Sequence, residues 1–196
     1  MKYELSNKDI LFVGLNPTEQ AKKHNAVFCQ TPEFWKLLSA AGYFDKVTFD
    51  KLWKKAEIDK KINKGVKNDG RYKEFAPVCF GTETRIGYCD LIPDCFEKKS
   101  NKVEVMSMDV MRLLEKLSPS NIKKIGLLGK QVAKKFMKHA SHNERSVKGA
   151  VSYGYLDTIE INGNMIEVYC LPFPTTTPMK TEDKIKEYKK MNAGSI

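Results

Sequence analysis

The chain has 196 residues, enough for one domain with a hydrophobic core of its own. Apolar residues make up 41% and charged residues 30%, as in ordinary soluble globular proteins, and there is no run of about 18 apolar residues to span a membrane. The net charge of +10 favours polyanions such as nucleic acids as partners, although solubility alone would also account for a basic chain. The first residues, Met1-Lys2-Tyr3-Glu4, lack the pattern of a secretory signal, so we expect a cytoplasmic protein.

The most informative stretch of the chain lies at residues 10–17. Ile10 to Leu15 form a continuous apolar run, which is typical of a strand buried in a parallel sheet. Asn16 follows directly, and Pro17 prevents further pairing. A neutral amide is therefore expected at the carboxyl edge of a central strand, where open α/β sheets bind their ligands. Asn before Pro is also common in ordinary turns, so the motif alone leaves both interpretations open.

A basic segment lies at residues 46–73, where ten Lys or Arg residues face four Asp or Glu residues. Trp53, Ile58 and Ile62 indicate a helix with one apolar stripe. We interpret the segment as a basic insertion in a single domain over residues 1–196. It is either a solvated helix and loop or an arm that contacts phosphates.

Three further strand-like runs end near Ile92, at Leu128 and at Leu171, with helical patterns between them. Strands that alternate with helices predict an α/β fold, in which helices cover both faces of a parallel sheet. Because the carboxyl ends of parallel strands meet at one edge, the loops that follow Leu128 and Leu171 are expected to lie close to the Asn16 loop.

Two helices and a hairpin complete the expected elements. Asn162-Gly163 predicts the turn of a hairpin over residues 156–169, whose second strand continues into the main sheet. The last helix is expected over residues 181–191. Gly129 allows a sharp turn into an amphipathic helix, whose apolar face consists of Val132, Ala133, Phe136 and Met137.

Metal sites and nucleophilic catalysis are not indicated by the sequence. His139 and His142 are three residues apart, but no Cys or carboxylate cluster completes a zinc site. No Ser-His-Asp or Cys-His arrangement and no P-loop motif is apparent, so we expect neither a metal nor a cofactor. The cysteines form no C-x-x-C pair and are expected to be buried free thiols; they are Cys29, Cys79, Cys89, Cys95 and Cys170.

The segment at residues 171–178, Leu-Pro-Phe-Pro-Thr-Thr-Thr-Pro, reads as a rigid turn directly after a strand. Its prolines restrict the backbone, its threonines offer hydroxyl groups, and it contains no carboxylate. Such a turn suits close approach to the phosphates of a nucleic acid.

Taken together, these motifs resemble the uracil-DNA glycosylase superfamily, especially its mismatch-specific uracil/thymine-DNA glycosylase branch and the related hypoxanthine-DNA glycosylases. The resemblance covers most of the chain in order. It rests on Gly14-Leu15-Asn16-Pro17, Phe28 followed by Pro32-Glu33-Phe34-Trp35-Lys36, Gly87-Tyr88-Cys89-Asp90-Leu91-Ile92, Gly129-Lys130 and the stretch from Leu171. It implies a three-layer αβα sandwich with a central four-stranded parallel sheet.

The resemblance also implies an activity and the residues that carry it. Such an enzyme flips a damaged or mismatched base out of DNA and hydrolyses its N-glycosidic bond. By resemblance, Asn16 positions the attacking water, Phe28 stacks on the flipped base, and Thr18 borders it. The backbone N–H group of Leu15 or of Phe28 reads the edge of the base. The residues expected to contact the DNA backbone are Lys130, Thr175, Thr176, Thr177 and Lys180.

The chain departs from the family pattern at Phe173, which stands where the family has Asn or His in the base pocket. A shifted alignment would instead match residues 173–178 to a Leu-Pro-Ser-Thr-Ser-Pro stretch of the hypoxanthine branch. Uracil, hypoxanthine, mismatched thymine and alkylated bases all remain possible targets. The expected partner is double- or single-stranded DNA, bound by a monomer that would associate with the nucleoid in a prokaryote.

Two other interpretations remain. The first is a catalytically weak or inactive DNA-damage or nucleic-acid-binding protein on the same fold, which Phe173 favours. The second is a nucleotide-pool or RNA-processing enzyme, which would show little preference for duplex DNA.

Overall fold

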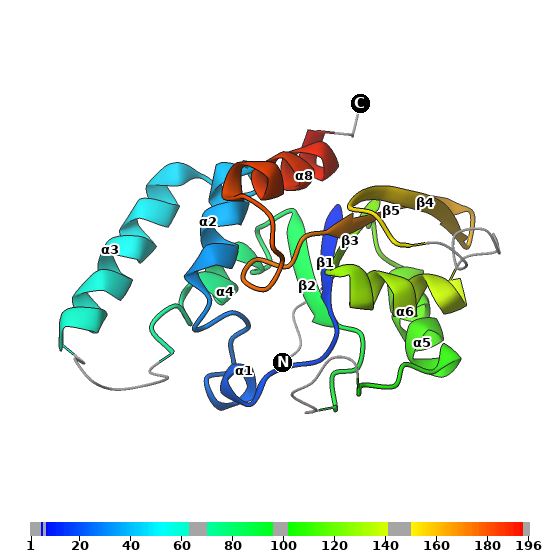
Figure 1. Ribbon diagram of the computed structural model, residues 1–196, viewed down its shortest axis with the longest axis horizontal. Coiled ribbons are helices and arrows are strands. Elements are labelled where there is room, and N and C mark those ends of the chain that lie inside the picture. The colour runs from blue at the N-terminus through cyan, green and yellow to red at the C-terminus, as the bar shows by residue number, and fades with distance from the viewer. Residues whose placement is uncertain (1–4, 6, 63–69, 96–101, 141–149, 194–196) are drawn as a thin grey trace.

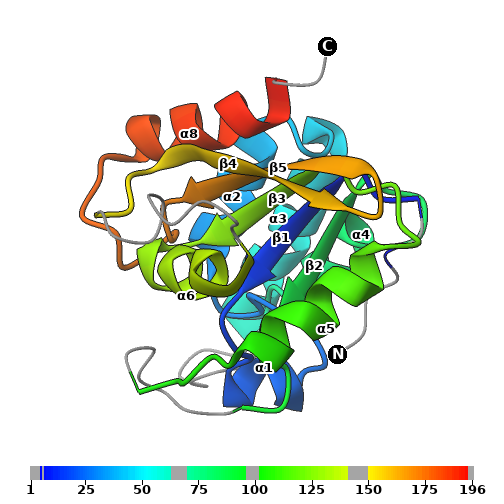
Figure 2. The same ribbon diagram turned by 90° about the vertical axis from the view of Figure 1, so that its right-hand side faces the viewer.

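A computed structural model describes residues 5, 7–62, 70–95, 102–140 and 150–193. Its centre is a five-stranded sheet in the order β2-β1-β3-β5-β4, seen face-on in Figure 2. Neighbouring strands from β2 to β5 are parallel, and β4 pairs with β5 in the antiparallel direction. The strands are β1 (Ile10–Gly14), β2 (Ile86–Asp90), β3 (Lys124–Leu128), β4 (Gly154–Ile161) and β5 (Asn164–Leu171).

The α/β class is confirmed, but the expected four-stranded parallel sheet is wrong, because the sheet is mixed and has five strands. The extra strand is the first arm of the predicted hairpin. Asn162 and Gly163 have φ values of 49° and 83°, as a tight two-residue turn requires, and the chain doubles back on itself there. β4 therefore lies at the edge of the sheet, and its pairing with β5 is necessarily antiparallel.

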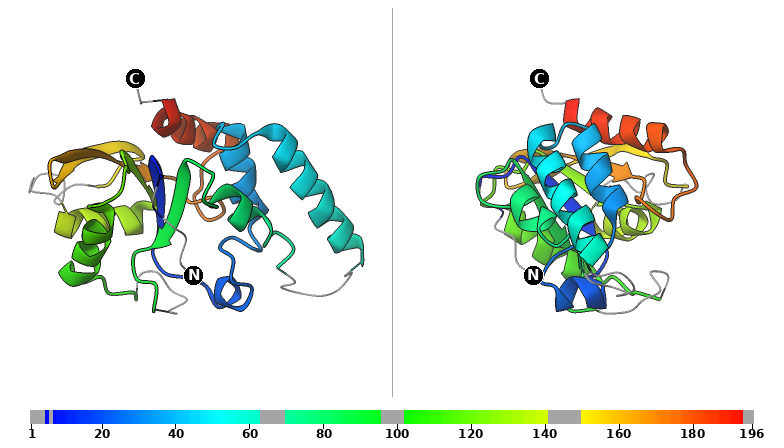
Figure 3. Two further views of the ribbon diagram at one scale, coloured as in Figure 1. Left: turned by 180° about the vertical axis from the view of Figure 1, so that it is seen from behind. Right: turned by 90° about the vertical axis from the view of Figure 1, so that its left-hand side faces the viewer.

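Helices lie on both sides of this sheet. Figures 1 and 3 show α5 and α6 on one side, and α2, α3 and α4 on the other. A hydrophobic cluster lies on each face of the sheet, and successive side chains of β1 point into one or the other. Ile10 and Phe12 belong to the cluster under α2 and α4, whereas Leu11 and Val13 belong to the cluster under α5 and α6. The helices are α1 (Glu19–Lys23), α2 (Pro32–Ala40), α3 (Lys46–Ile62), α4 (Phe75–Cys79), α5 (Ser107–Leu117), α6 (Lys130–Ala140) and α8 (Thr181–Ala193).

The helix expected in the basic segment is α3, but the prediction that it carries a single apolar stripe is wrong. Trp53 packs against the core and stacks on Phe49, whereas Ile58 and Ile62 are 48% and 73% exposed. Five residues turn an α-helix by roughly 140° beyond one full turn, so Trp53 and Ile58 lie on different faces. Residues 63–69 of the basic segment lie outside the described part of the chain.

Backbone hydrogen bonds join the loops at the carboxyl ends of the strands. The amides of Leu91 and Ile92, after β2, donate to the carbonyls of Gly14 and Leu15, each at 2.9 Å. The Gly129 amide, after β3, donates to the Leu171 carbonyl at 2.8 Å. Because β3 pairs in parallel with both β1 and β5, the three loops singled out from the sequence, after β1, β3 and β5, are neighbours at one edge of the sheet. In the described part of the chain, no helix is both long and apolar enough to cross a membrane.

Candidate functional site

A cavity of about 760 Å³ opens at this edge of the sheet. Four segments form its walls, at residues 14–21, 27–31, 128–132 and 176–178, and Tyr88, Tyr153 and Phe173 complete the lining. Its volume falls within the range of ordinary small-molecule sites, about 300–1,000 Å³. The cavity lies where open α/β sheets bind their ligands.

Most of the site residues expected from the sequence line this cavity. Thr175 and Lys180 are exceptions: both are exposed and neither contributes to the lining. The residues that the fold does bring together are Leu15, Asn16, Thr18, Phe28, Lys130, Phe173, Thr176 and Thr177.

Asn16 lies in the loop that follows β1 and is partly buried. Its side-chain Nδ2 donates a hydrogen bond of 3.2 Å to the carbonyl of Cys95, in the loop after β2. This bond fixes the plane of the amide and uses its nitrogen in a contact within the protein. The amide is thus held in place by the neighbouring strand's loop before any ligand arrives.

Phe28 occupies a strained turn. Its φ of 50° is rare for an aromatic residue, and such strain concentrates at functional sites. Its carbonyl accepts hydrogen bonds from the Thr31 amide at 3.0 Å and from Nε1 of the buried Trp35 at 3.1 Å. Its ring stacks on Phe34 with 3.8 Å between the ring centroids. The ring on the cavity wall is therefore supported from behind by α2.

The hydroxyl-rich loop at residues 172–178 is anchored by α8. Nζ of the buried Lys184 donates to the Pro174 carbonyl at 2.6 Å, and Oη of Tyr188 donates to the Pro172 carbonyl at 3.1 Å. Neither proline has an amide proton, so their carbonyls are the only backbone polar groups through which these residues can be held. Two side chains of a single helix thus set the position of Phe173 and the threonines that follow.

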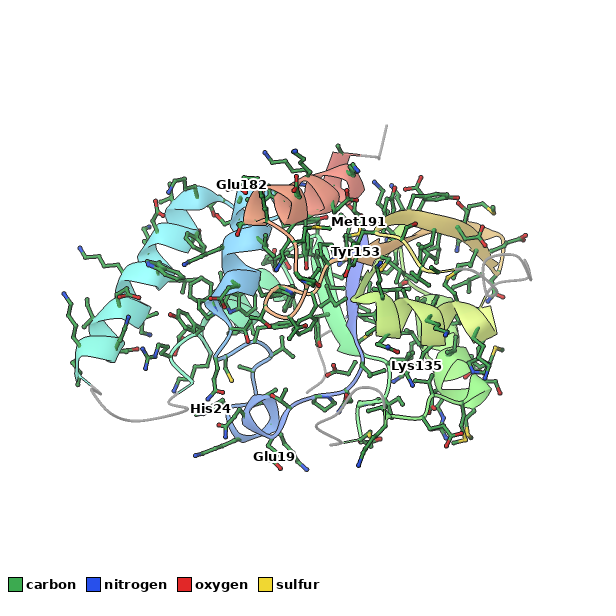
Figure 4. The ribbon with its side chains drawn as sticks, viewed as in Figure 1. Glu19, His24, Lys135, Tyr153, Glu182 and Met191 are labelled. Carbon is green, nitrogen blue, oxygen red and sulfur yellow. The ribbon has the colours of Figure 1, made fainter. Side chains whose placement is uncertain are left out.

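Lys130 and Thr177 meet at Tyr153, which Figure 4 shows beside α6. Nζ of Lys130 lies 4.8 Å from the centroid of the Tyr153 ring, within the range of a cation–π contact. Oη of Tyr153 and Oγ1 of Thr177 are 3.3 Å apart. Nothing in the sequence singled out Tyr153, because it precedes a strand and belongs to no motif.

Thr18 also has a structural role in the protein. Its Oγ1 accepts a hydrogen bond of 3.1 Å from the Ala21 amide and so caps α1. Thr18 also lines the cavity. Phe173 is partly buried, and its ring centroid is 6.3 Å from that of Phe28. The cavity therefore has two aromatic side chains in mutual contact.

Tyr88 and Asp90 lie at the end of β2, next to β1. Tyr88 lines the cavity, and its Oη donates to Oδ1 of Asp90 at 2.7 Å. Burial raises the pKa of Asp90 to about 6, and this effect outweighs the hydrogen bond from Tyr88, which lowers it. Gly14 is needed beside this pair, because a Cβ there would lie 2.1 Å from the Tyr88 hydroxyl oxygen. A carboxyl group that titrates near neutral pH thus lies directly behind the cavity wall.

Two glutamines on the wall were also missed in the sequence. Gln20 is on α1 and Gln30 is in the turn after Phe28. Each has a buried polar atom without a hydrogen-bond partner, Oε1 in Gln20 and Nε2 in Gln30. Proximity to Asn16 and Phe28 along the chain was the one available signal. That these two atoms are buried without a partner follows from tertiary packing, which the sequence does not show.

In the described part of the chain, no three His, Cys, Asp or Glu side chains lie close enough together to hold a metal ion. His142 lies outside the described residues. All five cysteines are free; Cys29, Cys79 and Cys170 are buried, whereas Cys89 and Cys95 are partly exposed. Burial raises the pKa of the Cys79 and Cys170 thiols, which keeps them protonated and unreactive at neutral pH.

No model of a protein family matches the sequence, and no curated protein matches it either.

Proposed function

We propose that this protein is a monofunctional DNA glycosylase of the uracil-DNA glycosylase type. The observation that carries the proposal is the meeting of Asn16, Phe28 and the loop at residues 172–178 around one cavity at the carboxyl edge of parallel strands. These three segments are far apart in the sequence and carry different chemistry. In a flipped nucleotide an aromatic ring can stack on the base, hydroxyl groups can contact phosphates, and an amide can hold a water.

In this proposal, the protein takes the target base out of the duplex and holds it in the cavity. Breaking the N-glycosidic bond places positive charge on the sugar and negative charge on the departing base. The Asn16 amide orients the attacking water, and its bond to the Cys95 carbonyl keeps it aligned. An amide is a poor base, so this role suits a reaction in which bond breaking runs ahead of water attack.

Base binding is assigned to the wall around Phe28. The ring stacks on the flipped base, a contact worth about 1–3 kcal/mol. The Phe34 ring behind it already holds the Phe28 side chain in place, so little conformational entropy is lost when a base binds. The backbone of Leu15 and the side chains of Thr18 and Phe173 border the base.

Contacts with the DNA backbone are assigned to Thr176 and Thr177 at the cavity rim, and to Thr175 and Lys180 on the exposed surface just beyond it. Lys130 contributes from the start of α6. The net charge of +10 supports a polyanionic partner. Binding should therefore weaken steeply as salt concentration rises, because each phosphate contact releases counterions.

The remaining parts of the proposal follow from the same resemblance. They are a three-layer αβα arrangement around the parallel strands, membership of the mismatch-specific or hypoxanthine branch, and action without metal or cofactor. A monomer that works on cytoplasmic or nucleoid DNA completes it.

A second candidate is a protein that binds damaged DNA without releasing the base. Phe173 favours it, because this side chain places an apolar ring, 6.3 Å from Phe28, where a polar group would help the base leave as an anion. Such a protein would show salt-sensitive binding and no base release.

The decisive experiment is a strand-cleavage assay after alkali treatment. Its substrates are single strands, and duplexes with uracil or hypoxanthine opposite each normal base. We expect base release by the wild type and at least a hundredfold slower release by Asn16→Ala, with DNA affinity retained. Asn121→Ala, at an exposed position outside the cavity, is the matched control and should act like the wild type.

The other outcomes separate the candidates. Salt-sensitive DNA binding without release from any substrate would favour the binding protein. Release from RNA or free nucleosides, with no preference for DNA, would favour the nucleotide-pool or RNA-processing enzyme. Binding that does not change with salt would contradict a DNA partner altogether.

A further inference from the structure

One face of α3 points away from the rest of the protein. The helix packs against the core through Phe49, Trp53 and Ala56. On its other side, exposed residues follow one another at intervals of four or three positions, which places them along one side of an α-helix. We call this side the outward stripe; it consists of Val47, Lys51, Lys54, Ile58 and Lys61. α3 lies at the outer side of the molecule, beyond α2 (Figure 1), and contributes no residue to the cavity wall.

The lysines of α3, all of them exposed, divide into two groups. Those outside the stripe are each paired with a carboxylate. The pairs are Lys46 with Asp50 at 2.8 Å, Lys55 with Glu74 at 3.6 Å, and Lys60 with Glu57 at 4.0 Å. In the described part of the chain, no carboxylate lies within ion-pair distance of Lys51, Lys54 or Lys61. The unpaired positive charge of the helix is therefore concentrated on its outward stripe.

The composition of the stripe favours a polyanion over a protein or a membrane. Protein interfaces are depleted of lysine and enriched in aromatic residues, methionine and arginine, and the stripe has lysines and none of the other three. Helices that lie in a membrane surface separate a large apolar face from a charged face. In α3 the large apolar side chains face the core, and the two aliphatic residues of the stripe alternate with its lysines.

The spacing of the lysines suits the backbone of a nucleic acid. From Lys51 to Lys61 the helix rises about 15 Å, at about 1.5 Å per residue. Each strand of duplex DNA presents a phosphate about every 3.4 Å along its axis. Three lysines spread over this length can each meet a different phosphate, and lysine binds phosphate as a compact point charge.

We propose that the outward stripe of α3 binds the phosphate backbone of duplex DNA, at a surface separate from the cavity. The net charge of +10 complements such a partner. The choice of DNA among polyanions rests on the proposed function, whereas the unpaired lysines on one side of α3 do not depend on it. The stripe holds the duplex through its backbone and reads no sequence.

The test measures the affinity for an undamaged, fluorescein-labelled DNA duplex by anisotropy over a series of salt concentrations. Each phosphate contact contributes about 0.9 to the slope of log affinity against log salt concentration. In Lys51→Gln/Lys54→Gln/Lys61→Gln, the stripe variant, this slope should become shallower by about 2–3. Its Tm should match that of the wild type, because the lysines are exposed and glutamine favours helix about as well as lysine does.

The matched control changes the paired lysines of the same helix. Lys46→Gln/Lys55→Gln/Lys60→Gln removes the same number of positive charges from the protein as the stripe variant does. It therefore changes the long-range attraction of DNA to the same extent and leaves the outward stripe intact. We expect its slope to change by less than about 1.

Equal slopes in the wild type and the stripe variant would overturn the proposal. Equal losses in the two variants would also overturn it, because the overall charge alone would then govern binding. An unchanged DNA slope with lost binding to phosphatidylserine-containing vesicles would overturn it in favour of a membrane surface. A shallower slope in the stripe variant alone, without base release from any substrate, would leave this inference standing and contradict the glycosylase. Base release by the wild type together with equal slopes would do the opposite.

Discussion

Nε1 of Trp35 donates a 3.1 Å hydrogen bond to the Phe28 carbonyl, and this bond joins the buried face of α2 to the turn that carries both Phe28 and Gln30. Trp35 is fully buried, so the bond is protected from water. A φ of 50° at Phe28 has to be maintained by its surroundings, and the indole is one of two donors that do so.

Replacing Trp35 by Phe should therefore loosen this turn. The change removes the donor and leaves a small void, and together these should lower the free energy of unfolding by about 1–3 kcal/mol. Hydrogen exchange of the Thr31 amide, which donates to the same carbonyl, should become faster. Trp53→Phe on α3 is the control and should leave this exchange rate unchanged. Equal rates in the wild type and Trp35→Phe would contradict a supporting role for the indole.

Lys184 is expected to be the main anchor of the loop at residues 172–178. Lys184→Met should keep much of the packing of the long side chain but lose the 2.6 Å bond to the Pro174 carbonyl. Hydrogen bonds from charged groups contribute about 1.5–3 kcal/mol, and we expect a destabilisation of this order in chemical denaturation. Limited proteolysis should cut the variant faster within this loop. Lys186→Met removes an exposed lysine from the same helix, and it should neither destabilise the protein nor speed proteolysis of the loop.

Gly14 and Tyr88 should be energetically coupled. In Gly14→Ala the new Cβ would lie 2.1 Å from the Tyr88 hydroxyl oxygen, so the variant should lose about 1–3 kcal/mol of stability. In Gly14→Ala/Tyr88→Phe that oxygen is absent, and the double variant should be more stable than the sum of the two single changes predicts. A double-mutant cycle by urea denaturation measures this coupling, and strictly additive losses would show that the clash is relieved elsewhere.

Asp90 should make stability depend on pH in a defined window. Its pKa is about 6 in the folded protein and about 4 in an unfolded chain, so the folded state binds the extra proton between these values. Stability should therefore fall as the pH rises from about 4 to about 6. Asp90→Asn, which cannot ionise, should be more stable than the wild type by about 1–3 kcal/mol at neutral pH and similar to it near pH 4.

The measurement is the difference in Tm between the two proteins across this pH range, which cancels the titration of other groups. Asp94→Asn changes an exposed carboxylate nearby and serves as the control. A difference between the wild type and Asp90→Asn that stays constant with pH would contradict the raised pKa.

The sequence by itself determined the parts of this protein that depend on local pattern. The apolar runs located the parallel strands, and Asn162-Gly163 located the hairpin turn. The face of α6 that carries Val132, Ala133, Phe136 and Met137 is buried, as its periodicity predicted. Because the carboxyl ends of parallel strands share an edge, the sequence also placed Asn16 near the loops that follow Leu128 and Leu171.

Only the tertiary structure decided which side chains meet. β4 lies at the edge of the sheet because β5 pairs with β3 on one side and with β4 on the other. The bond from Lys184 to Pro174, the pKa of Asp90 and the unpartnered amides of Gln20 and Gln30 all depend on burial among residues distant in sequence. Burial and hydrogen-bond partners are properties of three-dimensional packing, and no local pattern in a single sequence specifies them.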